Sequence, residues 1–486
     1  MDGIITVISE INDQYWLYLV IPLLALAGIY FTVRSRGVQF RMLPEMIRNL
    51  RDTPEVAEDG RKGISAFGAF SISAAARIGT GNIIGVSVAI STGGSGAVFW
   101  MWTMAIVVAA AAFIESTLAQ LYKRKAQGEF IGGPAYYMRH GLGKSWMGVI
   151  FAVVLIFTFP FSFMMVQANS FTGAINNSIE TAGGGTGMIT STIITLVLVV
   201  LVALVIFGGV RRIATVSQLM VPIMAGLYLL VGIAVVILNI DQVPVVFADI
   251  FGSAFGFQEI AGAGIGTAII VGVQRGMFSN EGGLGSAPNA GATASVSHPV
   301  KQGLTQAFGV YFDTLIICSI TAFIVLVSSP DLGNKKLEED LTQIAMKDNL
   351  GSWSLHLLTL ILLFLTFTSC LGNYYYGEAN LGYLTRNRTA FLGYRLAILG
   401  ITLLGGLAAL EVVWSLANVT MGVMAVVNLA AIVPLGGVAF KLLRDYDTQR
   451  RAGLDPVFTR DRIPELTDVE CWEPAEEKPV TQNSVG

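Results

Sequence analysis

The segment Arg77–Gly85, "RIGTGNIIG", places an arginine, a threonine, an asparagine and three glycines inside a long apolar stretch. Glycine permits a turn and lets a ligand approach the backbone closely. A helix interrupted here frees main-chain N–H and C=O groups that a continuous helix would pair. Freed N–H groups at a helix N-terminus suit a carboxylate, and freed carbonyls suit Na⁺. The segment therefore predicts a binding site built from backbone.

A second interruption of the same kind lies in the other half of the chain, at Arg275–Pro288, "RGMFSNEGGLGSAP". Glycine-interrupted helices at corresponding positions of two halves are the best sequence indication of a secondary transporter's binding site. Alone, Gly79–Asn82 fits a small-residue packing face equally well. The pairing of the two breaks favours the binding site.

The composition predicts the elements that carry these breaks. Hydrophobic residues make up 53% of the 486 and charged residues only 13%, about half the share in a soluble domain. Apolar runs long enough to cross a bilayer recur along the chain. We therefore expect an all-α polytopic membrane protein with eleven spans, at 15–33, 64–93, 96–122, 146–172, 187–209, 213–239, 258–280, 302–328, 353–383, 391–410 and 412–440.

Lysine and arginine placement orients these spans. On the eleven-span topology 25 of the 30 Lys and Arg fall on one side and three on the other. The positive-inside rule then predicts an outer N-terminus and a cytoplasmic C-terminus. We expect an N-terminal helix and connector (1–63), a five-helix repeat (64–240), an inverted second repeat (258–440) and a cytoplasmic tail (441–486).

Several motifs resemble the alanine or glycine:cation symporter family. They are "GTGNIIGVSVAI" at 79–90, "GGSGAVFWMW" at 93–102, "GGPAYYM" at 132–138, "SNEGGLGSAPNAGATA" at 279–294 and "NYYYGE" at 373–378. The resemblance runs from about Val33 to Arg444. The sequence departs from the family pattern at Thr103, which is usually apolar, at Val108, which is usually glycine, and at Gly282, where alanine is commoner. Asn373 occupies a position that is Trp in some members and Asn in others.

The resemblance implies a leucine-transporter-like fold of five plus five inverted helices, with one extra N-terminal helix and a discontinuous first helix in each half. It implies Na⁺-driven uptake of a small neutral amino acid, alanine or glycine, across a bacterial or archaeal cytoplasmic membrane by alternating access. We expect no organic cofactor, with Na⁺ as the coupling ion, and a functional monomer.

For the substrate, we expect the N–H groups of Thr80 and Gly81, beside Gly79, to hold the carboxylate. The resemblance makes Gln167 a pocket residue, although a buried amide can also simply tie helices together. It also makes Phe278 a wall over a methyl-sized side chain, where core packing is the alternative. Asn373 and Ser369 complete the expected substrate-binding set.

For sodium, the candidate ligands are the carbonyls near Ala75 and Ile78, together with Asn82, Thr368 and Ser369. The alternative for each hydroxyl is a hydrogen bond to the carbonyl one turn earlier in its own helix, which is common for Ser and Thr in membranes. By resemblance, we expect one of Thr368 and Ser369 to ligate Na⁺ and the other to lie near the substrate.

Several charged residues fall within or beside the spans, where a charge is functional by default and a partner is expected. We expect Arg275 and Glu281 to form a gating ion pair near the cytoplasmic end. Arg77 is expected to face a carboxylate, either Glu115 or Glu378. Gating and structural roles are equally open for these residues.

Other function classes lack the residues they need. The three histidines and three cysteines are scattered and show no transition-metal spacing. "GTGNIIG" has no P-loop lysine, and no set of enzyme residues is clustered, so we expect neither an enzyme nor a nucleic-acid partner. Three alternatives to Na⁺-coupled symport remain. They are proton coupling through Glu115 or Glu378, an exchanger of the same fold, and a channel.

Overall fold

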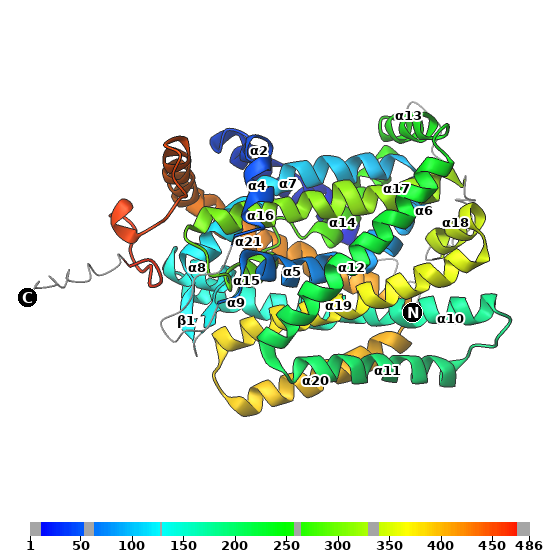
Figure 1. Ribbon diagram of the computed structural model, residues 1–486. Coiled ribbons are helices and arrows are strands. Elements are labelled where there is room, and N and C mark those ends of the chain that lie inside the picture. Colours follow the sequence, from blue (N-terminus) through cyan, green and yellow to red (C-terminus); the bar gives the residue numbers. More distant parts are fainter. Residues whose placement is uncertain (1–10, 53–62, 127–128, 257–263, 329–339, 474–486) are drawn as a thin grey trace, which may run out of the picture.

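The computed structural model describes residues 11–52, 63–126, 129–256, 264–328 and 340–473, and these residues are almost entirely helical (Figure 1). Helices follow from the composition, because a chain in hydrocarbon must satisfy its backbone polar groups internally. The helices are α2 (Ile21–Arg34), α3 (Val38–Arg41), α4 (Leu43–Asn49), α5 (Ala66–Arg77), α6 (Val86–Gly93), α7 (Gly96–Leu121), α8 (Pro134–His140), α9 (Ser145–Ile156), α10 (Met164–Thr181), α11 (Met188–Ile206), α12 (Gly209–Leu238), α13 (Val243–Ala254), α14 (Ile265–Asn280), α15 (Ala287–Gly291), α16 (Pro299–Val310), α17 (Ser319–Val327), α18 (Leu341–Leu350), α19 (Ser352–Leu384), α20 (Arg388–Leu407) and α21 (Leu410–Arg451).

Four π-helical turns interrupt or prolong the long helices: Trp16–Val20, Gly81–Gly85, Phe157–Phe163 and Tyr311–Cys318. Such turns are rare and occur often at functional sites. The last three contribute residues to the candidate site described below.

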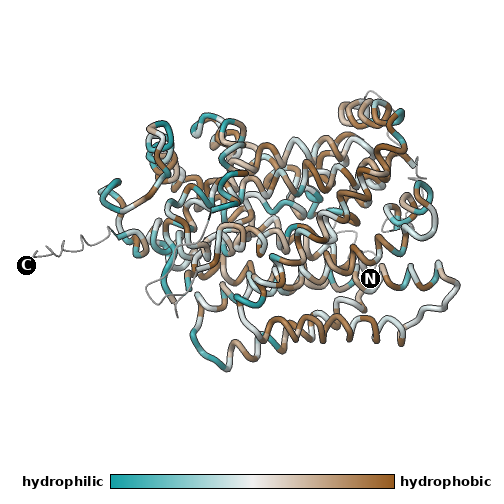
Figure 2. The backbone as a smooth tube through the Cα atoms, in the orientation of Figure 1, coloured by the Kyte–Doolittle hydropathy of each residue, from teal (hydrophilic) through white to brown (hydrophobic). Residues whose placement is uncertain are grey.

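Among the described residues, nine helices are long and apolar enough to cross a membrane, and ten if the bent pair Ala66–Arg77 and Gly81–Gly93 counts as one span. The long helices are hydrophobic along most of their length (Figure 2). The predicted all-α membrane protein is therefore confirmed. The predicted span 258–280 corresponds to α14, which has only 16 described residues, so the count of eleven stays a prediction.

Three elements lie where connectors were expected. α13 follows α12, α18 precedes α19, and a small antiparallel hairpin joins β1 (Arg124–Ala126) to β2 (Glu129–Ile131). α21 continues to Arg451, eleven residues beyond the end of the predicted span 412–440. Hydropathy marks where the bilayer ends, whereas the helix itself continues through charged residues.

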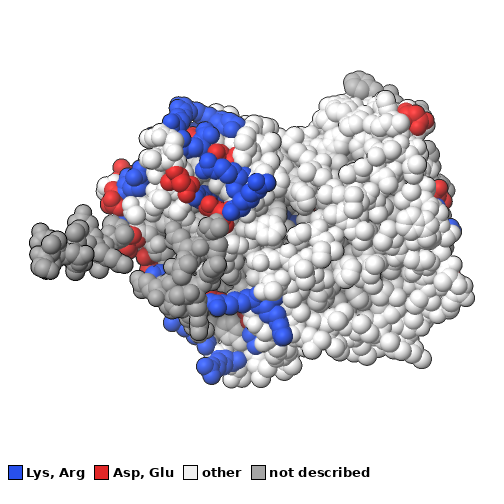
Figure 3. Space-filling model, in the orientation of Figure 1, with Lys and Arg blue, Asp and Glu red and all other residues white. Residues whose placement is uncertain are grey.

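The basic residues gather at one end of the molecule, and the opposite end is nearly free of them on the face in view (Figure 3). The chain after α21 folds back onto this basic end. Trp472 donates its indole N–H to the carbonyls of Gln120 and Leu121 at 3.1 Å each. Arg124 donates to Asp468 at 2.6 Å. This part of the predicted tail is thus fixed to the end of α7.

Small residues allow α7 to pack closely against its neighbours α14 and α16. A Cβ on Gly272 would lie 2.4 Å from the carbonyl oxygen of Ala97, and one on Gly303 would lie 2.0 Å from Oγ1 of Thr117. Membrane helices use small residues in this way because close backbone approach drives their association.

Two of the departures from the family pattern meet at this packing surface. A Cβ on Gly282 would lie 2.6 Å from Cγ2 of Val108. The absence of a side chain at Gly282 therefore leaves room for the side chain of Val108. In volume, the small residue at one position compensates for the large residue at the other.

This contact predicts a coupled pair of substitutions. Gly282→Ala alone should lower the thermal midpoint in detergent, because overpacking a tight core costs about 1–3 kcal/mol and a valine has little rotamer freedom. Adding Val108→Ala should recover much of that loss, so the double variant should be more stable than additivity of the single variants predicts. Strictly additive losses would contradict the compensation.

Candidate sodium and amino-acid site

The first helix of the core is broken between α5 and the turn Gly81–Gly85, and the two helical parts meet at an angle of 54°. Gly79 N–H donates to Oδ1 of Asn82 at 2.9 Å, not to the carbonyl of Ala75. Asn82 N–H donates to the carbonyl of Gly79 at 3.2 Å, not to that of Ile78. The break therefore removes both Ala75 and Ile78 carbonyls from the helical hydrogen-bond pattern.

α19 supplies the group that these carbonyls meet. Oγ of Ser369 lies 2.8 Å from the carbonyl oxygen of Ala75 and 3.4 Å from that of Ile78, and the serine is fully buried. One hydroxyl proton cannot satisfy two carbonyls at once. Three oxygens with a single proton among them form a group that suits a small hard cation such as Na⁺.

Glycine is required where the break touches α19 and α14. A Cβ on Gly79 would lie 2.3 Å from Oγ of Ser369, and one on Gly81 would lie 2.8 Å from Cδ1 of Phe278. No side chain fits at either position without displacing a neighbour. The glycines thus let the backbone reach both partner helices.

The amide of Gln167, on α10, also contacts the break, because an added Cβ on Gly79 would lie 3.1 Å from its Nε2 and Oε1. Its Oε1 accepts hydrogen bonds from N–H of Thr80 at 3.2 Å and from Oγ1 of Thr80 at 2.5 Å. The structure therefore brings Gln167 to the same backbone N–H that was expected to meet a substrate carboxylate.

Asn373 lies one turn after Ser369 on α19 and is fully buried. Neither Oδ1 nor Nδ2 of this amide has a hydrogen-bond partner in the described structure. Leaving such groups unpaired costs about 1–3 kcal/mol each. An unpaired amide beside the break indicates a place where a polar ligand completes the hydrogen bonds.

Aromatic rings close the site on the side of α14. The ring of Phe278 lies 4.2 Å from that of Phe163 and 4.6 Å from that of Trp414, measured between centroids. Phe163 ends the π-helical turn that leads into α10. This stack restricts the volume next to Gly81, as expected for a wall over a small side chain.

Comparison with known proteins decides the family. The family model described as "Sodium:alanine symporter family" matches residues 1–460. The chain belongs to this family. The amino-acid carrier protein AlsT of Bacillus subtilis is 46% identical over 462 residues, which cover 95% of this chain and 96% of AlsT.

Two further relatives within the sodium:alanine symporter family have more specific names. The probable sodium/glutamine symporter GlnT of Bacillus subtilis is 46% identical over 481 residues, covering 98% of each chain. The sodium/alanine symporter AgcS of Methanococcus maripaludis is 35% identical over 454 residues, covering 92% of this chain and 98% of AgcS. The solved structure of MhsT in complex with L-phenylalanine is 12% identical, with a TM-score of 0.49 over 79% of this chain and 99% of MhsT.

The second break follows α14 and begins at Glu281, six residues after Arg275, where the sequence placed its start. Glu281 has a left-handed backbone (φ 57°), as do Gly283 and Gly285. Glu115 on α7 holds this loop, because its two carboxylate oxygens accept from N–H of Gly283 at 3.2 Å and of Gly285 at 3.1 Å. Nδ2 of Asn428 on α21 donates to Glu115 at 2.7 Å. Glu115 is thus a positioning residue for the second break.

The expected partner of Arg77 is not found among the described residues. Glu378 forms an ion pair with Arg395 at 2.9 Å, and Glu115 bonds to the loop. Arg77 is buried and donates Nη1 to the carbonyl of Gln306 at 3.1 Å. Its charge acts on the buried carboxylates of Glu115, Glu281 and Asp313 without an ion pair to any of them in the described structure.

The predicted Arg275–Glu281 pair is wrong. Arg275 donates to Oδ1 of Asn418 at 2.6 Å and lies over the ring of Trp414, whereas Glu281 accepts from the hydroxyl of Ser286 at 2.6 Å. The physical reason is the break itself: Arg275 lies inside α14, and the left-handed turn at Glu281 carries the carboxylate away from that helix.

Asn82 and Thr368 have different surroundings from those expected of sodium ligands. Nδ2 of Asn82 donates to Oδ1 of Asp313 at 2.6 Å, and Ser279 donates to Oδ2 of the same carboxylate at 2.5 Å. Oγ1 of Thr368 donates to carbonyls of its own helix, Phe364 at 2.9 Å and Leu365 at 3.0 Å. Asp313, which links the two breaks, had no assigned role in the sequence-based site. Its place within an apolar span was the available signal.

No group of three or more His, Cys, Asp or Glu side chains that could hold a metal ion occurs in the described part of the chain. The candidate cation site is made of carbonyl and hydroxyl oxygens instead. That chemistry suits an alkali cation and offers no soft ligand for a transition metal.

The two adjacent hydroxyls of α19 predict different sodium responses. Ser369→Ala should raise the Na⁺ concentration for half-maximal uptake about tenfold or more, because a hydrogen-bonding partner of a charge is worth about 1.5–3 kcal/mol and 1.4 kcal/mol is tenfold. Thr368→Ala should change it less than about threefold. The measurement is uptake against Na⁺ concentration at constant ionic strength, and equal shifts would contradict the assignment.

Two asparagines of α19 predict opposite stability effects. Asn373→Leu should keep or raise the thermal midpoint of the ligand-free protein, because it removes two unpaired buried groups, and should weaken amino-acid binding more than about tenfold. The control is Asn380→Leu, since Nδ2 of Asn380 bonds to Asn289 at 3.0 Å and to Tyr376 at 2.9 Å. That variant should lower the midpoint. If Asn373→Leu lowers the thermal midpoint as much as Asn380→Leu does, Asn373 has a structural role and not a binding role.

Proposed function

We propose that the protein couples the uptake of small neutral amino acids, chiefly alanine and glycine, to the entry of Na⁺ by alternating access. The observation that carries this proposal is the convergence of the Ser369 hydroxyl on the carbonyls of Ala75 and Ile78. The N–H groups of the same break lie within a few residues. Cation and carboxylate would therefore organise one short segment together.

In this mechanism Na⁺ binds to the three oxygens and fixes the angle of the break. The substrate carboxylate then takes the N–H groups of Thr80 and Gly81, with Gln167 and Asn373 supplying further hydrogen bonds. Because each ligand stabilises the same backbone geometry, binding of one favours binding of the other. Such positive coupling is what a symporter requires.

Selection for small side chains follows from the wall at Phe278. Its ring touches the position of a Gly81 Cβ and is itself held between Phe163 and Trp414. A pocket that is too small by one methylene discriminates by about 1–3 kcal/mol. The relative GlnT carries glutamine in its name, so the side-chain preference has to be measured on this protein.

The five-plus-five inverted arrangement, the repeats at 64–240 and 258–440, and a functional monomer remain part of the proposal. Orientation is proposed from charge: the basic end of Figure 3 would face the cytoplasm. That end includes the residues after α21, and the opposite end, near α13 and α18, would face outward.

Proton coupling is the second candidate, favoured by a different residue from those the sequence suggested. Glu378 is paired with Arg395 and Glu115 holds the loop of the second break, whereas Asp313 lies between the two breaks as a buried carboxylate whose donors, Asn82, Ser279 and Thr314, are neutral. A site of this kind can hold either a proton or a cation. It lies between the two breaks, where its occupancy would affect both.

Purified protein in proteoliposomes tests the proposal. We expect alanine to accumulate under an inward Na⁺ gradient and not under a pH gradient alone, with glycine competing strongly and leucine weakly. Ser369→Ala liposomes are the control for specific coupling. Accumulation driven by a pH gradient without Na⁺ would favour the second candidate, and stronger competition by glutamine than by glycine would overturn the proposed substrate.

A further inference from the structure

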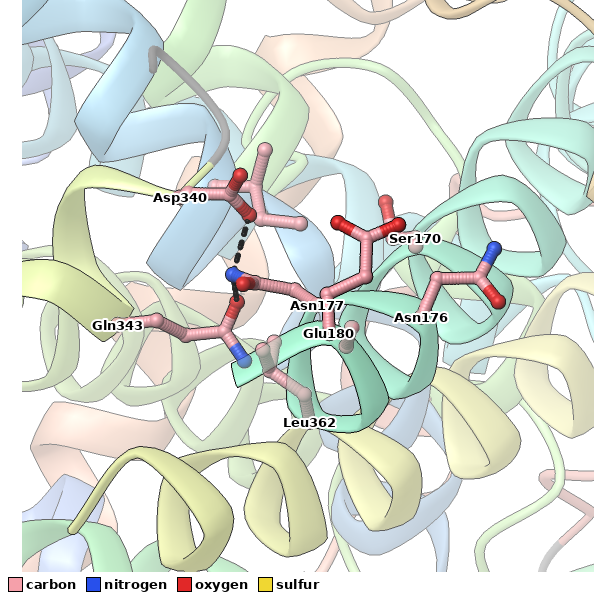
Figure 4. Close-up of a pocket in the computed structure, with 10 residues that line it drawn as sticks. Ser170, Asn176, Asn177, Glu180, Asp340, Gln343 and Leu362 are labelled. Carbon is pink, nitrogen blue, oxygen red and sulfur yellow. Dashed lines mark hydrogen bonds between the residues drawn. The ribbon is translucent and has the colours of Figure 1, made fainter. Parts of the chain in front are cut away.

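A pocket of about 180 Å³ opens at the end of the molecule opposite the basic end, between α10, α18 and α19. Figure 4 shows its polar wall, which includes Ser170, Asn177, Glu180, Asp340 and Gln343. A cavity of roughly 150 Å³ already holds a molecule of benzene's size. The pocket therefore has room for a small organic molecule and is far larger than a bare ion needs.

The pocket continues from the candidate site. On α10, Ser170 and Ala174 follow Gln167 at helical spacing and lie on the same face. On α19, Leu362 lies two turns before Ser369, and Ile84 belongs to the turn that forms the first break. The pocket therefore lies along the same two helices as Gln167 and Ser369, towards the end of the molecule opposite the basic end.

The charge of the pocket selects for cationic groups. Among the described residues, its lining contains the carboxylates of Glu180 and Asp340 and no lysine or arginine. Nδ2 of Asn177 donates at 2.7 Å to both Oδ1 of Asp340 and Oε1 of Gln343 (Figure 4), which fixes the position of the Asp340 carboxylate. Burial raises the pKa of Asp340, the hydrogen bond from Asn177 opposes that rise, and the charge of Glu180 adds to it. A bound positive charge would offset the cost of burying the Asp340 carboxylate and would reduce its repulsion from Glu180.

A second, independent feature indicates a ligand. Ser170 is only 1% exposed, lines the pocket, and its Oγ has no hydrogen-bond partner among the described residues. Oδ1 of the neighbouring Asn176 is also unpaired. Gly173 faces open space, with no atom within 4 Å of an added Cβ. The pocket thus offers an unpaired hydroxyl in addition to the two carboxylates.

We propose that this pocket is an outer binding site in which a zwitterionic amino acid pauses before it enters the central site. Its ammonium group meets Asp340 and Glu180, and its carboxylate meets the hydroxyl of Ser170. The inference rests on the proposed amino-acid transport. A bare Na⁺ would use the same carboxylates, so the test separates the two cations.

The test is initial alanine uptake into proteoliposomes at saturating Na⁺. We expect the double variant Asp340→Asn, Glu180→Gln to raise the KM for alanine about fivefold or more, with the maximal rate and the half-saturating Na⁺ concentration unchanged. The matched control is Asp241→Asn, Asp348→Asn, which removes two acidic charges outside the pocket and should leave all three parameters unchanged.

A second variant fills the pocket without removing a charge. Gly173→Leu has open space for its side chain and should raise the KM for alanine in the same way. Gly226→Leu on α12, whose added Cβ also meets nothing within 4 Å, is the control. At both positions the added Cβ meets no neighbouring atom, so both variants should fold.

The outcomes are distinct. An unchanged KM in both the charge and the Gly173 variants, with normal wild-type uptake, would overturn the outer site. A rise in the half-saturating Na⁺ concentration with an unchanged alanine KM would assign the pocket to Na⁺ and also overturn it. Absence of alanine uptake by the wild-type protein would instead count against the proposed function itself.

Discussion

The structure depends on one constraint: backbone groups freed inside a membrane protein must be paired by other protein groups or by a ligand. At the first break, Asn82 takes the N–H of Gly79, Gln167 takes the N–H of Thr80, and Ser369 takes the carbonyls of Ala75 and Ile78. Asn82 belongs to the break itself, whereas Gln167 and Ser369 come from α10 and α19. The break therefore depends both on its own sequence and on helices far away in the chain that converge on it.

The pairing at the first break is incomplete in an informative way. Two carbonyls share one hydroxyl proton, and the amide of Asn373 has no partner. A purely structural break would be paired completely, because unpaired groups are costly at this depth. The break thus has both acceptors and a donor that are not fully paired. A bound cation would be coordinated by the acceptors, and a zwitterionic amino acid would complete the hydrogen bonds of the amide.

The second break is held differently. Glu115 accepts the N–H groups of Gly283 and Gly285, and Asn428 donates to Glu115 and to the carbonyl of Gly283, so this loop is a fixed structural element. Asp313 joins the two breaks through Asn82 and Ser279. Arg77 forms no ion pair in the described structure and donates to the carbonyl of Gln306. Of the charges that the sequence suggested as gates, Arg77 and Glu115 therefore bond to backbone groups.

Much of the architecture could be read from the sequence. Runs of apolar residues determine helices because hydrocarbon leaves the backbone no other partner, and the glycine-rich segments marked both breaks. Ser369, Gln167 and Asn373 could be named because the motifs resemble a family with a known arrangement. The end of α21, by contrast, lies eleven residues beyond the predicted span, since hydropathy records the bilayer and not the helix.

The sequence by itself determined the class of fold, the family and the positions where helices break, because these follow from local composition. Only the tertiary structure decided which side chains meet. It joined Ser369 to Ala75, paired Glu378 with Arg395, separated Arg275 from Glu281, and set Val108 against Gly282. These contacts depend on helix rotation and crossing, which are fixed by packing among many helices and leave no local signal in the chain.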